Sequence, residues 1–287
     1  MESRNKEFKK MIENPGVIVA PGVYDVMGAR IVQKAGFKVC YMTGNGVVAS
    51  SLGLPDIGLA TMTEMTRMAH NITARIDLPL ICDSDNGYGD LNNTWRAVRE
   101  FEAAGASAIH IEDQVFPKRC GAMAGVRLNS QEEAVEKIKI ALKARTDPNF
   151  MIIARTDARR AVSMEDAISR VKAYANAGAD IVFVEQLESL EEIRQVASSV
   201  NNAPLMYDIL EESKRVTYTV QEVADQGAKI VIFALSSIMF MAKQLSRLMK
   251  EIAGTGTTLG LYDELMPIHD YEELMGLHEE RSIRDLL

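Results

Sequence analysis

The stretch NTWRAVREFEAAGASAIHIEDQ, residues 93–114, contains the repeating unit that decides the fold. Its first half has the apolar spacing of an amphipathic helix. The triplet from Ala104 to Ala106 then places a glycine where a left-handed helix C-cap would lie. The second half, SAIHIEDQ, is a short and mostly apolar run, which is typical of a strand in a buried parallel sheet. This stretch therefore predicts a helix that leads directly into a buried strand.

The same alternation extends along the whole chain. Strand-length apolar runs recur eight times, and helical spacing fills most of the gaps between them. Eight such units in about 250 residues predict an α/β fold of the (β/α)8 type, the TIM barrel. A doubly wound open sheet is the alternative, but no glycine-rich dinucleotide-binding motif follows the first run. The expected strands lie in residues 16–22, 37–44, 78–85, 107–114, 150–157, 180–186, 203–209 and 228–235, and the clearest helices in residues 93–106, 130–145, 163–179 and 189–200.

The domain organisation follows from the absence of any linker rich in Pro, Gly or Ser, so we expect one barrel domain over residues 1–287. An N-terminal helix is expected in residues 1–15 and a C-terminal helical tail in residues 254–287. The apolar side chains of this tail need a surface to cover, on their own barrel or on a neighbouring subunit. They are Leu265, Met266, Ile268, Leu274, Met275, Leu277, Ile283, Leu286 and Leu287.

Composition excludes several classes of function. The formal net charge of -8 argues against a nucleic-acid surface, which needs clustered Lys and Arg. The N-terminus is polar, and no apolar run is long enough to cross a bilayer, so we expect a cytoplasmic protein without membrane contact. Three cysteines indicate reduced thiols rather than a disulfide framework, and Cys40 and Cys82 lie in apolar runs, as packing residues do.

Ionisable residues are concentrated at the ends of the expected strands. In a barrel, the carboxyl ends of the strands carry the catalytic groups. Helix surfaces could hold the same charges at lower cost, so solvation alone does not explain their position. For Asp113, Asp157 and Glu185 the alternative is structural, as caps or ion-pair partners that hold loops. The residues are Asp83 and Asp85 after the third run, Glu112 and Asp113 after the fourth, Arg155 and Asp157 after the fifth, and Glu185 after the sixth.

Asp83 and Asp85 indicate a metal site. Side chains repeat every second residue along a strand, so these two carboxylates would face the same space. They must share a proton, have pKa values that differ, or bind a divalent cation. With Glu112 from the next strand they form a set of hard oxygen donors that suits Mg2+, with Mn2+ as the alternative ion. His110 could face the same interior, but a single histidine makes a poor zinc site.

A magnesium site of this kind predicts an anionic substrate that chelates the ion. Arg155 has a planar guanidinium group that can bind a carboxylate through two hydrogen bonds. Backbone amides near Gly44 could receive an oxyanion.

Four motifs resemble the isocitrate lyase and phosphoenolpyruvate mutase superfamily. They are TGNGVVASSLGLPD (residues 43–56), CDSDNGYGD (82–90), HIEDQVFPKRCG (110–121) and ARTDA (154–158), within a similarity that runs from about Val17 to Leu235. The resemblance implies a Mg2+-dependent (β/α)8 barrel that acts on an α-oxyacid through an enolate-like or oxyanion intermediate. It also implies a homotetramer, a dimer of dimers, in which C-terminal helices swap between subunits.

The resemblance also implies roles for individual residues. Asp83, Asp85 and Glu112 match the metal-shell carboxylates, and Arg155 matches the arginine that binds the substrate carboxylate. The implied substrate-binding residues are Tyr41, Thr43, Gly44, Asn45, Asp56, His110, Gly121, Arg155, Glu185 and Tyr207.

The loop after the fourth strand distinguishes the reactions of the superfamily. Its carbon-carbon lyases carry K-[KR]-C-G-H there, and their cysteine protonates the departing carbanion. This chain has PKRCGA, which makes Cys120 the implied proton donor and Lys118 and Arg119 catalytic residues that would lower the thiol pKa. The glycine-containing loop could move as a lid. An exposed thiol without a role is the alternative.

Three positions depart from the lyase pattern. Ala122 stands where the lyases have histidine, and Ala234 replaces a frequent proline. Tyr207 or Asp208 replaces an asparagine that binds a carboxylate. These changes lie on the side that holds the leaving diacid, so we expect a different second half of the substrate. A 2-hydroxy diacid with alkyl substituents, such as dimethylmalate, would fit.

Three functions remain open. The first is a lyase that cleaves a 2-hydroxy di- or tricarboxylate of the 2-methylisocitrate or dimethylmalate type to an α-oxoacid, such as pyruvate, and a smaller carboxylate. The second is a mutase, hydrolase or decarboxylase for phosphonopyruvate, carboxyphosphoenolpyruvate or oxaloacetate, which would not need Cys120. The third is an inactive barrel that only binds metabolites, against which the intact metal ligands argue.

Overall fold

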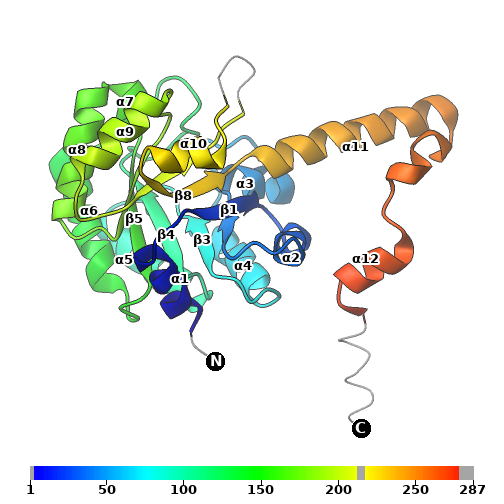
Figure 1. The fold of residues 1–287 in the computed structure, drawn as a ribbon, viewed down its shortest axis with the longest axis horizontal. Helices are drawn as coiled ribbons and strands as arrows, with labels where there is room; N and C mark the ends of the chain where they lie inside the picture. Colours follow the sequence, from blue (N-terminus) through cyan, green and yellow to red (C-terminus); the bar gives the residue numbers. More distant parts are fainter. Residues whose placement is uncertain (1–2, 212–216, 278–287) are drawn as a thin grey trace, which may run out of the picture.

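The centre of the molecule is a closed barrel of eight parallel strands, which follow one another in chain order until β8 pairs with β1 (Figure 1). The computed structural model describes residues 3–211 and 217–277. The (β/α)8 fold predicted from the sequence is confirmed, and every expected strand is present. The strands are β1 (Ile18–Val23), β2 (Cys40–Met42), β3 (Leu80–Asp83), β4 (Ala108–Glu112), β5 (Met151–Thr156), β6 (Ile181–Val184), β7 (Leu205–Asp208) and β8 (Ala228–Phe233).

The helices lie around the outside of the barrel, and α1 lies at its amino-terminal end (Figure 1). Each predicted A-G-A triplet ends a barrel helix with a left-handed glycine, Gly105 at φ 86° and Gly178 at φ 101°. The helices are α1 (Arg4–Glu13), α2 (Val26–Lys34), α3 (Gly44–Leu52), α4 (Met62–Thr73), α5 (Leu91–Ala103), α6 (Gln131–Ala144), α7 (Ala158–Ala161), α8 (Met164–Asn176), α9 (Leu190–Ser199), α10 (Val220–Asp225), α11 (Ser236–Thr255), the 3-10 helix η1 (Leu259–Glu264) and α12 (Ile268–Leu274).

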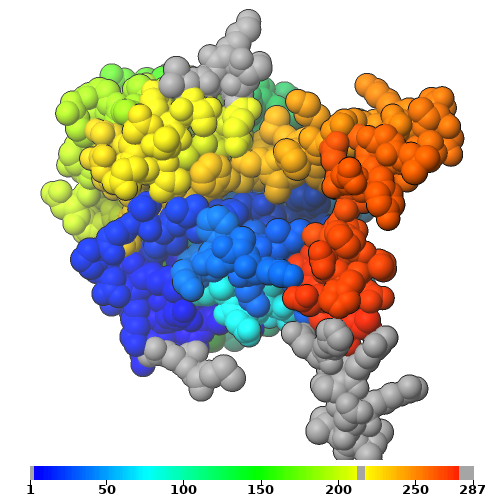
Figure 2. Space-filling model, turned by 45° about the vertical axis from the view of Figure 1, so that its right-hand side comes forward, coloured from blue at the N-terminus to red at the C-terminus, as the bar shows by residue number. Residues whose placement is uncertain are grey.

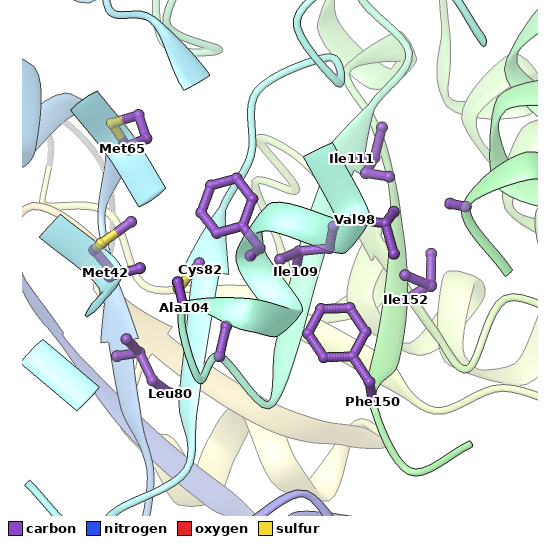
Figure 3. Close-up of a cluster of buried hydrophobic side chains, with 14 of the residues drawn as sticks. Met42, Met65, Leu80, Cys82, Val98, Ala104, Ile109, Ile111, Phe150 and Ile152 are labelled. Atoms are coloured by element: carbon purple, nitrogen blue, oxygen red, sulfur yellow. The ribbon is translucent and has the colours of Figure 1, made fainter. Parts of the chain in front are cut away.

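Both faces of the central strands are buried, which explains their continuously apolar sequences. On the outer face, Cys82, Ile109 and Ile152 gather around α5 (Figure 3). On the inner face, side chains such as Ile81 and Phe183 fill the barrel. Cys82 is fully buried among these apolar side chains, as its sequence context predicts.

The strand register positions the charged residues. Asp83 pairs with His110 across β3 and β4, and Glu112 pairs with Arg155 across β4 and β5. Because parallel strands end together at one rim, these four side chains lie at the same end of the barrel.

The C-terminal helices do not continue around the barrel. The 20-residue helix α11 has no buried residue and projects away from the body of the molecule (Figure 1). The start of α11 contacts the barrel, where the hydroxyl of Ser237 donates to the carbonyl of Gly22 at 2.6 Å, and the helix then extends beyond the barrel (Figure 1). Of the predicted apolar tail residues, Ile283, Leu286 and Leu287 lie outside the described residues.

The chain then turns back, and α12 lies beside α2 (Figure 2). Arg30 of α2 donates a hydrogen bond of 2.8 Å to the carbonyl of Leu274, and Lys34 lies 3.3 Å from Glu273. None of the helices in the described ranges combines the length and the apolar character needed to cross a lipid bilayer.

Candidate active site

A cavity of about 40 Å³ lies at the carboxyl ends of the strands. Its walls come from strand residues of β2, β3, β5, β6, β7 and β8 and from the segments that follow β2, β4, β6, β7 and β8. It brings together most of the residues that the sequence nominated. The lining residues are Tyr41, Thr43, Asn45, Asp56, Asp83, Lys118, Cys120, Gly121, Ala122, Arg155, Phe183, Glu185, Asp208, Leu210, Ile232, Ala234 and Leu235.

Asp83 and Asp85 have opposite electrostatic environments. The chain does not stay extended through both residues, because Asp85 adopts a left-handed φ of 48° and its amide donates to Oδ1 of Asp83. Although burial raises the pKa of Asp83, His110, Lys118 and Arg155 lower it to about 2. Burial raises the pKa of Asp85 to about 6, against the effect of Lys118. The two carboxyl groups therefore differ in pKa, which is one of the outcomes predicted for this pair.

Lys118 is the cation nearest to these acids. Its Nζ lies 2.6 Å from Oδ1 of Asp56 and 2.7 Å from Oδ1 of Asp85. Burial lowers the pKa of this ammonium, but Asp85, Glu112 and other carboxylates outweigh burial and raise it well above its ordinary value. Lys118 therefore carries a positive charge and ties the loop after β4 to the loops after β2 and β3.

The predicted metal ligands Asp83, Asp85 and Glu112 are not arranged to coordinate one metal ion directly. Within residues 3–211 and 217–277, no three His, Cys, Asp or Glu side chains are arranged to hold a metal ion. The carboxylate of Asp85 is instead engaged by Lys118, because Asp85 leaves the extended conformation of the strand and its Oδ1 lies 2.7 Å from the ammonium. Oε1 of Glu112, however, is buried and accepts no hydrogen bond within the described chain. Mg2+ commonly retains waters and uses only one or two carboxylates, so these oxygens fit a hydrated Mg2+.

Arg155 is held by the acids around it. Its Nε and Nη2 donate to Asp157 at 3.1 and 2.9 Å, and Nη2 lies 3.4 Å from Glu185. The guanidinium also lies 5.3 Å from the ring centre of Phe183. Among the described residues, its Nη1 donates no hydrogen bond, which leaves this nitrogen for a ligand.

Asp113 is a structural residue. Its carboxylate accepts hydrogen bonds from Thr156 at 2.6 Å, Tyr174 at 2.7 Å and Arg170 at 3.0 Å. It thereby connects β4 to the end of β5 and to α8. The structural alternative therefore holds for Asp113, and Asp157 serves to orient Arg155.

Tyr41, His110 and the start of α3 form the wall next to Asp83. The hydroxyl of Tyr41 lies 2.9 Å from Nε2 of His110, and burial lowers the pKa of this histidine to about 4, so the ring is neutral. Thr43 caps α3, and the amide of Gly44 donates to Oδ2 of Asp83 at 3.2 Å. The Gly44 amide is thus already used and does not wait for a substrate oxyanion.

Cys120 lies in the cavity wall, and its amide donates to the carbonyl of Asp56 at 3.0 Å. The prediction that its basic neighbours lower the thiol pKa is wrong. Burial raises the pKa of Cys120 to about 11, and Lys118 opposes this only weakly because it is paired with Asp56 and Asp85. Arg119 does not line the cavity, and its Nη1 donates to the carbonyl of Ala124.

Gly121 lies too close to the charged wall for any larger residue. A methyl group at this position would lie 2.5 Å from Cγ of Glu185 and 2.6 Å from Nη2 of Arg155. The loop is anchored further back, where the side-chain amide of Gln114 bonds both the N–H and the carbonyl of Arg119. The loop after β4 therefore closes tightly over the cavity.

Tyr207 is not a cavity residue. It packs in the apolar layer between sheet and helices, and Asp208, the other candidate, lines the cavity because neighbouring strand residues face opposite sides. Phe183 was missed, although it precedes Glu185 by two and therefore shares its face. Lys137 of α6 was also missed, since nothing in the sequence links it to the carbonyls of Asn86 and Gly89, to which its Nζ donates.

The chain is similar to enzymes of known activity. It matches the family model described as phosphoenolpyruvate phosphomutase over residues 8–253. It is 38% identical to 2,3-dimethylmalate lyase of Eubacterium barkeri over 277 residues, which cover 96% of each chain. It is 40% identical to 2-methylisocitrate lyase of Aeropyrum pernix over 272 residues, which cover 95% of this chain and 87% of that protein.

Solved structures share the whole fold. Oxaloacetate acetylhydrolase in complex with the inhibitor 3,3-difluorooxalacetate superposes with a TM-score of 0.93 at 31% identity, covering 99% of this chain and 96% of the other. Phosphonopyruvate hydrolase in complex with oxalate and Mg2+ superposes with a TM-score of 0.88 at 26% identity, covering 99% of both chains.

Proposed function

The chain belongs to the phosphoenolpyruvate mutase and isocitrate lyase superfamily, and we propose that it is a Mg2+-dependent carbon-carbon lyase. Its substrate is a 2-hydroxy di- or tricarboxylate of the dimethylmalate or 2-methylisocitrate type. The products are an α-oxoacid, such as pyruvate, and a smaller carboxylate. Both relatives named above, which cover nearly all of this chain, are lyases for acids of this kind.

One observation carries this proposal: the thiol of Cys120 lines the same small cavity as Asp83 and Arg155. Cleavage of a carbon-carbon bond leaves a carbanion that must receive a proton. A thiol whose pKa is raised to about 11 keeps its proton at neutral pH, so Cys120 is ready to act as a donor. A phosphoryl mutase would have no use for a proton donor at this position, whereas hydrolysis of oxaloacetate also releases a carbanion that needs a proton, so the products formed must separate the lyase from that hydrolase.

The acidic side of the cavity would hold the α-oxyacid half of the substrate. Asp83, Asp85 and Glu112 would hold Mg2+, which polarises the oxygens of an α-oxyacid and stabilises negative charge on them. Arg155 would bind the carboxylate of this half through Nη1, while Asp157 and Glu185 fix the direction of the guanidinium.

The loop after β4 would cover the substrate. A volume of about 40 Å³ accommodates little more than a few water molecules, so the loop must open to admit an organic acid. On closing, Lys118 pairs with Asp56 and Asp85, and Cys120 comes into the cavity wall. Closure would thus exclude water and deliver the proton donor in the same movement.

Hydrolysis of oxaloacetate is the second candidate function. The similar structure of oxaloacetate acetylhydrolase supports this alternative. Incubation with Mg2+ and a panel of acids separates the two functions. The panel contains 2,3-dimethylmalate, 2-methylisocitrate, oxaloacetate and phosphonopyruvate. We expect pyruvate from the first two acids; release of oxalate and acetate from oxaloacetate alone would establish the hydrolase instead.

A further inference from the structure

The side of the cavity opposite the acidic cluster is mostly apolar. In the closed order of eight strands, β7 lies across the barrel from β3, which carries Asp83. On this side the lining residues include Leu210 after β7 and Ala234 and Leu235 after β8. Asp208, the last residue of β7, is the one ionisable group among them. If the α-oxyacid half of the substrate lies against Asp83, the other half must reach this apolar side.

Asp208 has a side chain held by a backbone hydrogen bond, and no cation among the described residues pairs with it. Its Oδ1 accepts a hydrogen bond of 3.1 Å from the amide of Ala234. Within the described chain it forms no ion pair, whereas Lys118 is paired with Asp56 and Asp85 and lies on the acidic side. The second oxygen of Asp208 is therefore available to the cavity.

The charges around Asp208 favour its neutral form. Among the described residues, the titratable and charged groups that face it are Glu185 after β6, Arg155 on β5, Tyr41 on β2 and Glu211 on its own loop, while β8 contributes an amide and apolar side chains. Burial raises the pKa of Asp208 to about 8, Glu185 adds to this, and the Ala234 amide and Arg155 oppose it. Burial also raises the pKa of Glu185, but Arg155 at 3.4 Å opposes this, so the nearby cation favours the ionised form of Glu185 over that of Asp208.

We propose that Asp208, as a carboxylic acid, binds the carboxylate of the leaving half of the substrate by donating a hydrogen bond from its free oxygen. This inference rests on the proposed lyase function. Two ionised carboxylates would repel each other in this apolar corner, but a protonated acid and a carboxylate form a strong charge-assisted hydrogen bond. Asp208 thus takes the place of a cation on this side of the cavity.

The same arrangement selects the class of substrate. The proton on Asp208 can form a hydrogen bond with one carboxylate of the substrate. The apolar neighbours provide no hydrogen-bond donor for a second carboxylate. The cavity should therefore accept a 2-hydroxy dicarboxylate whose leaving half carries one carboxylate and small alkyl groups. A tricarboxylate, whose leaving half carries two carboxylates, is disfavoured. Dimethylmalate should be cleaved with a higher kcat/KM than 2-methylisocitrate.

The pH dependence of the reaction tests this role. Asp208 donates only while it is protonated, so kcat/KM of the parent for 2,3-dimethylmalate should be constant below about pH 8 and fall about tenfold per pH unit above it. An amide donates at every pH, so Asp208→Asn should lose this alkaline decline, whatever its absolute activity. Asp208→Ala should raise KM by about tenfold to a hundredfold, with a smaller change in kcat. The exposed Asp225 on α10 offers a control, because Asp225→Asn should keep the parental profile.

Three results would overturn the inference. They are an alkaline decline that persists in Asp208→Asn, an unchanged KM in a folded Asp208→Ala, and preference of the parent for 2-methylisocitrate. If the parent cleaves neither acid, the proposed function fails, and calorimetric binding of 2,3-dimethylmalate decides about Asp208. Binding that weakens above about pH 8 in the parent but not in Asp208→Asn retains the role of Asp208. Absent or pH-independent binding removes it.

Discussion

Asp83 and Asp85 are separated by one residue, yet their carboxyl groups differ in pKa because their partners differ. Asp83 has three cationic or polar neighbours, whose combined effect overcomes its burial and lowers its pKa to about 2. Asp85 is held by Lys118 but lies close to Asp83 and Asp56, and its pKa is raised to about 6. A divalent cation bound between them would favour the ionised form of both groups.

Asp85→Ala should abolish both turnover and its dependence on Mg2+, because it removes one oxygen ligand from a small site. The parent should bind Mg2+ in calorimetry and gain thermal stability from it, and the variant should lose both effects while remaining folded. Asp77→Ala, at an exposed position, is the control and should behave as the parent. Full activity of the parent in EDTA would contradict the metal assignment.

The sequence predicted the identity of the site residues better than their interactions. Asp83, Arg155 and Glu185 were found because strand ends of a barrel meet at one rim, which follows from the fold alone. The thiol pKa was predicted in the wrong direction because a sequence shows that Lys118 precedes Cys120 but not that its ammonium points to Asp56 and Asp85. Burial, which decides this pKa, depends on how the loop closes.

At the scale of elements, the loop after β4 carries Lys118 and Cys120 and holds them at the cavity. Gln114 fixes its base, Lys118 pairs with acids on two other loops, and Gly121 lies against Arg155 and Glu185. The position of Gly121 leaves no room for a side-chain atom. Closure of the loop should therefore depend on the glycine.

Gly121→Ala should prevent full closure, because the added methyl group would lie 2.5 Å from Cγ of Glu185. We expect kcat/KM to fall by on the order of a hundredfold, since Cys120 would no longer reach its position in the wall. Gly254→Ala is the matched control, because no atom lies within 4 Å of a methyl group there. Parental kinetics in Gly121→Ala would show that the closed loop is not the active form.

The secondary structure was predictable where every residue of an element is buried. All eight strands were recognised because both faces of each are covered, so that their sequences are apolar without interruption. Helix α11 was different. Its pattern indicates a helix, but a pattern of apolar residues does not say whether they cover the same barrel or another subunit.

At the scale of the whole molecule, α11 and the segment after it have an exposed apolar face. No part of the same described chain covers this face. Large apolar side chains remain more than a third exposed over this region, and Figure 1 shows the helix standing away from the barrel. A surface of this kind is typical of an interface. The residues are Met239, Phe240, Leu245, Met249, Ile252, Leu259, Tyr262, Leu265, Met266, Ile268, Tyr271 and Met275.

We propose that other copies of the chain cover this face and that the protein is a homotetramer. Light scattering at micromolar concentration should give the mass of four chains. Phe240→Glu, which places a charge at a side chain 67% exposed on α11, should dissociate the assembly and leave the barrel folded. Val162→Glu, at a residue 62% exposed on the barrel, should remain assembled. A monomeric parent would contradict this proposal.

The central claim is that Cys120 gives a proton to the carbanion released by carbon-carbon cleavage. Release of pyruvate from 2,3-dimethylmalate by the parent and by Cys120→Ser tests it most directly. Serine has nearly the same shape, but its hydroxyl is a much weaker acid, so turnover should fall by on the order of a hundredfold or more while substrate binding changes little. Near-parental turnover by Cys120→Ser would contradict the lyase mechanism.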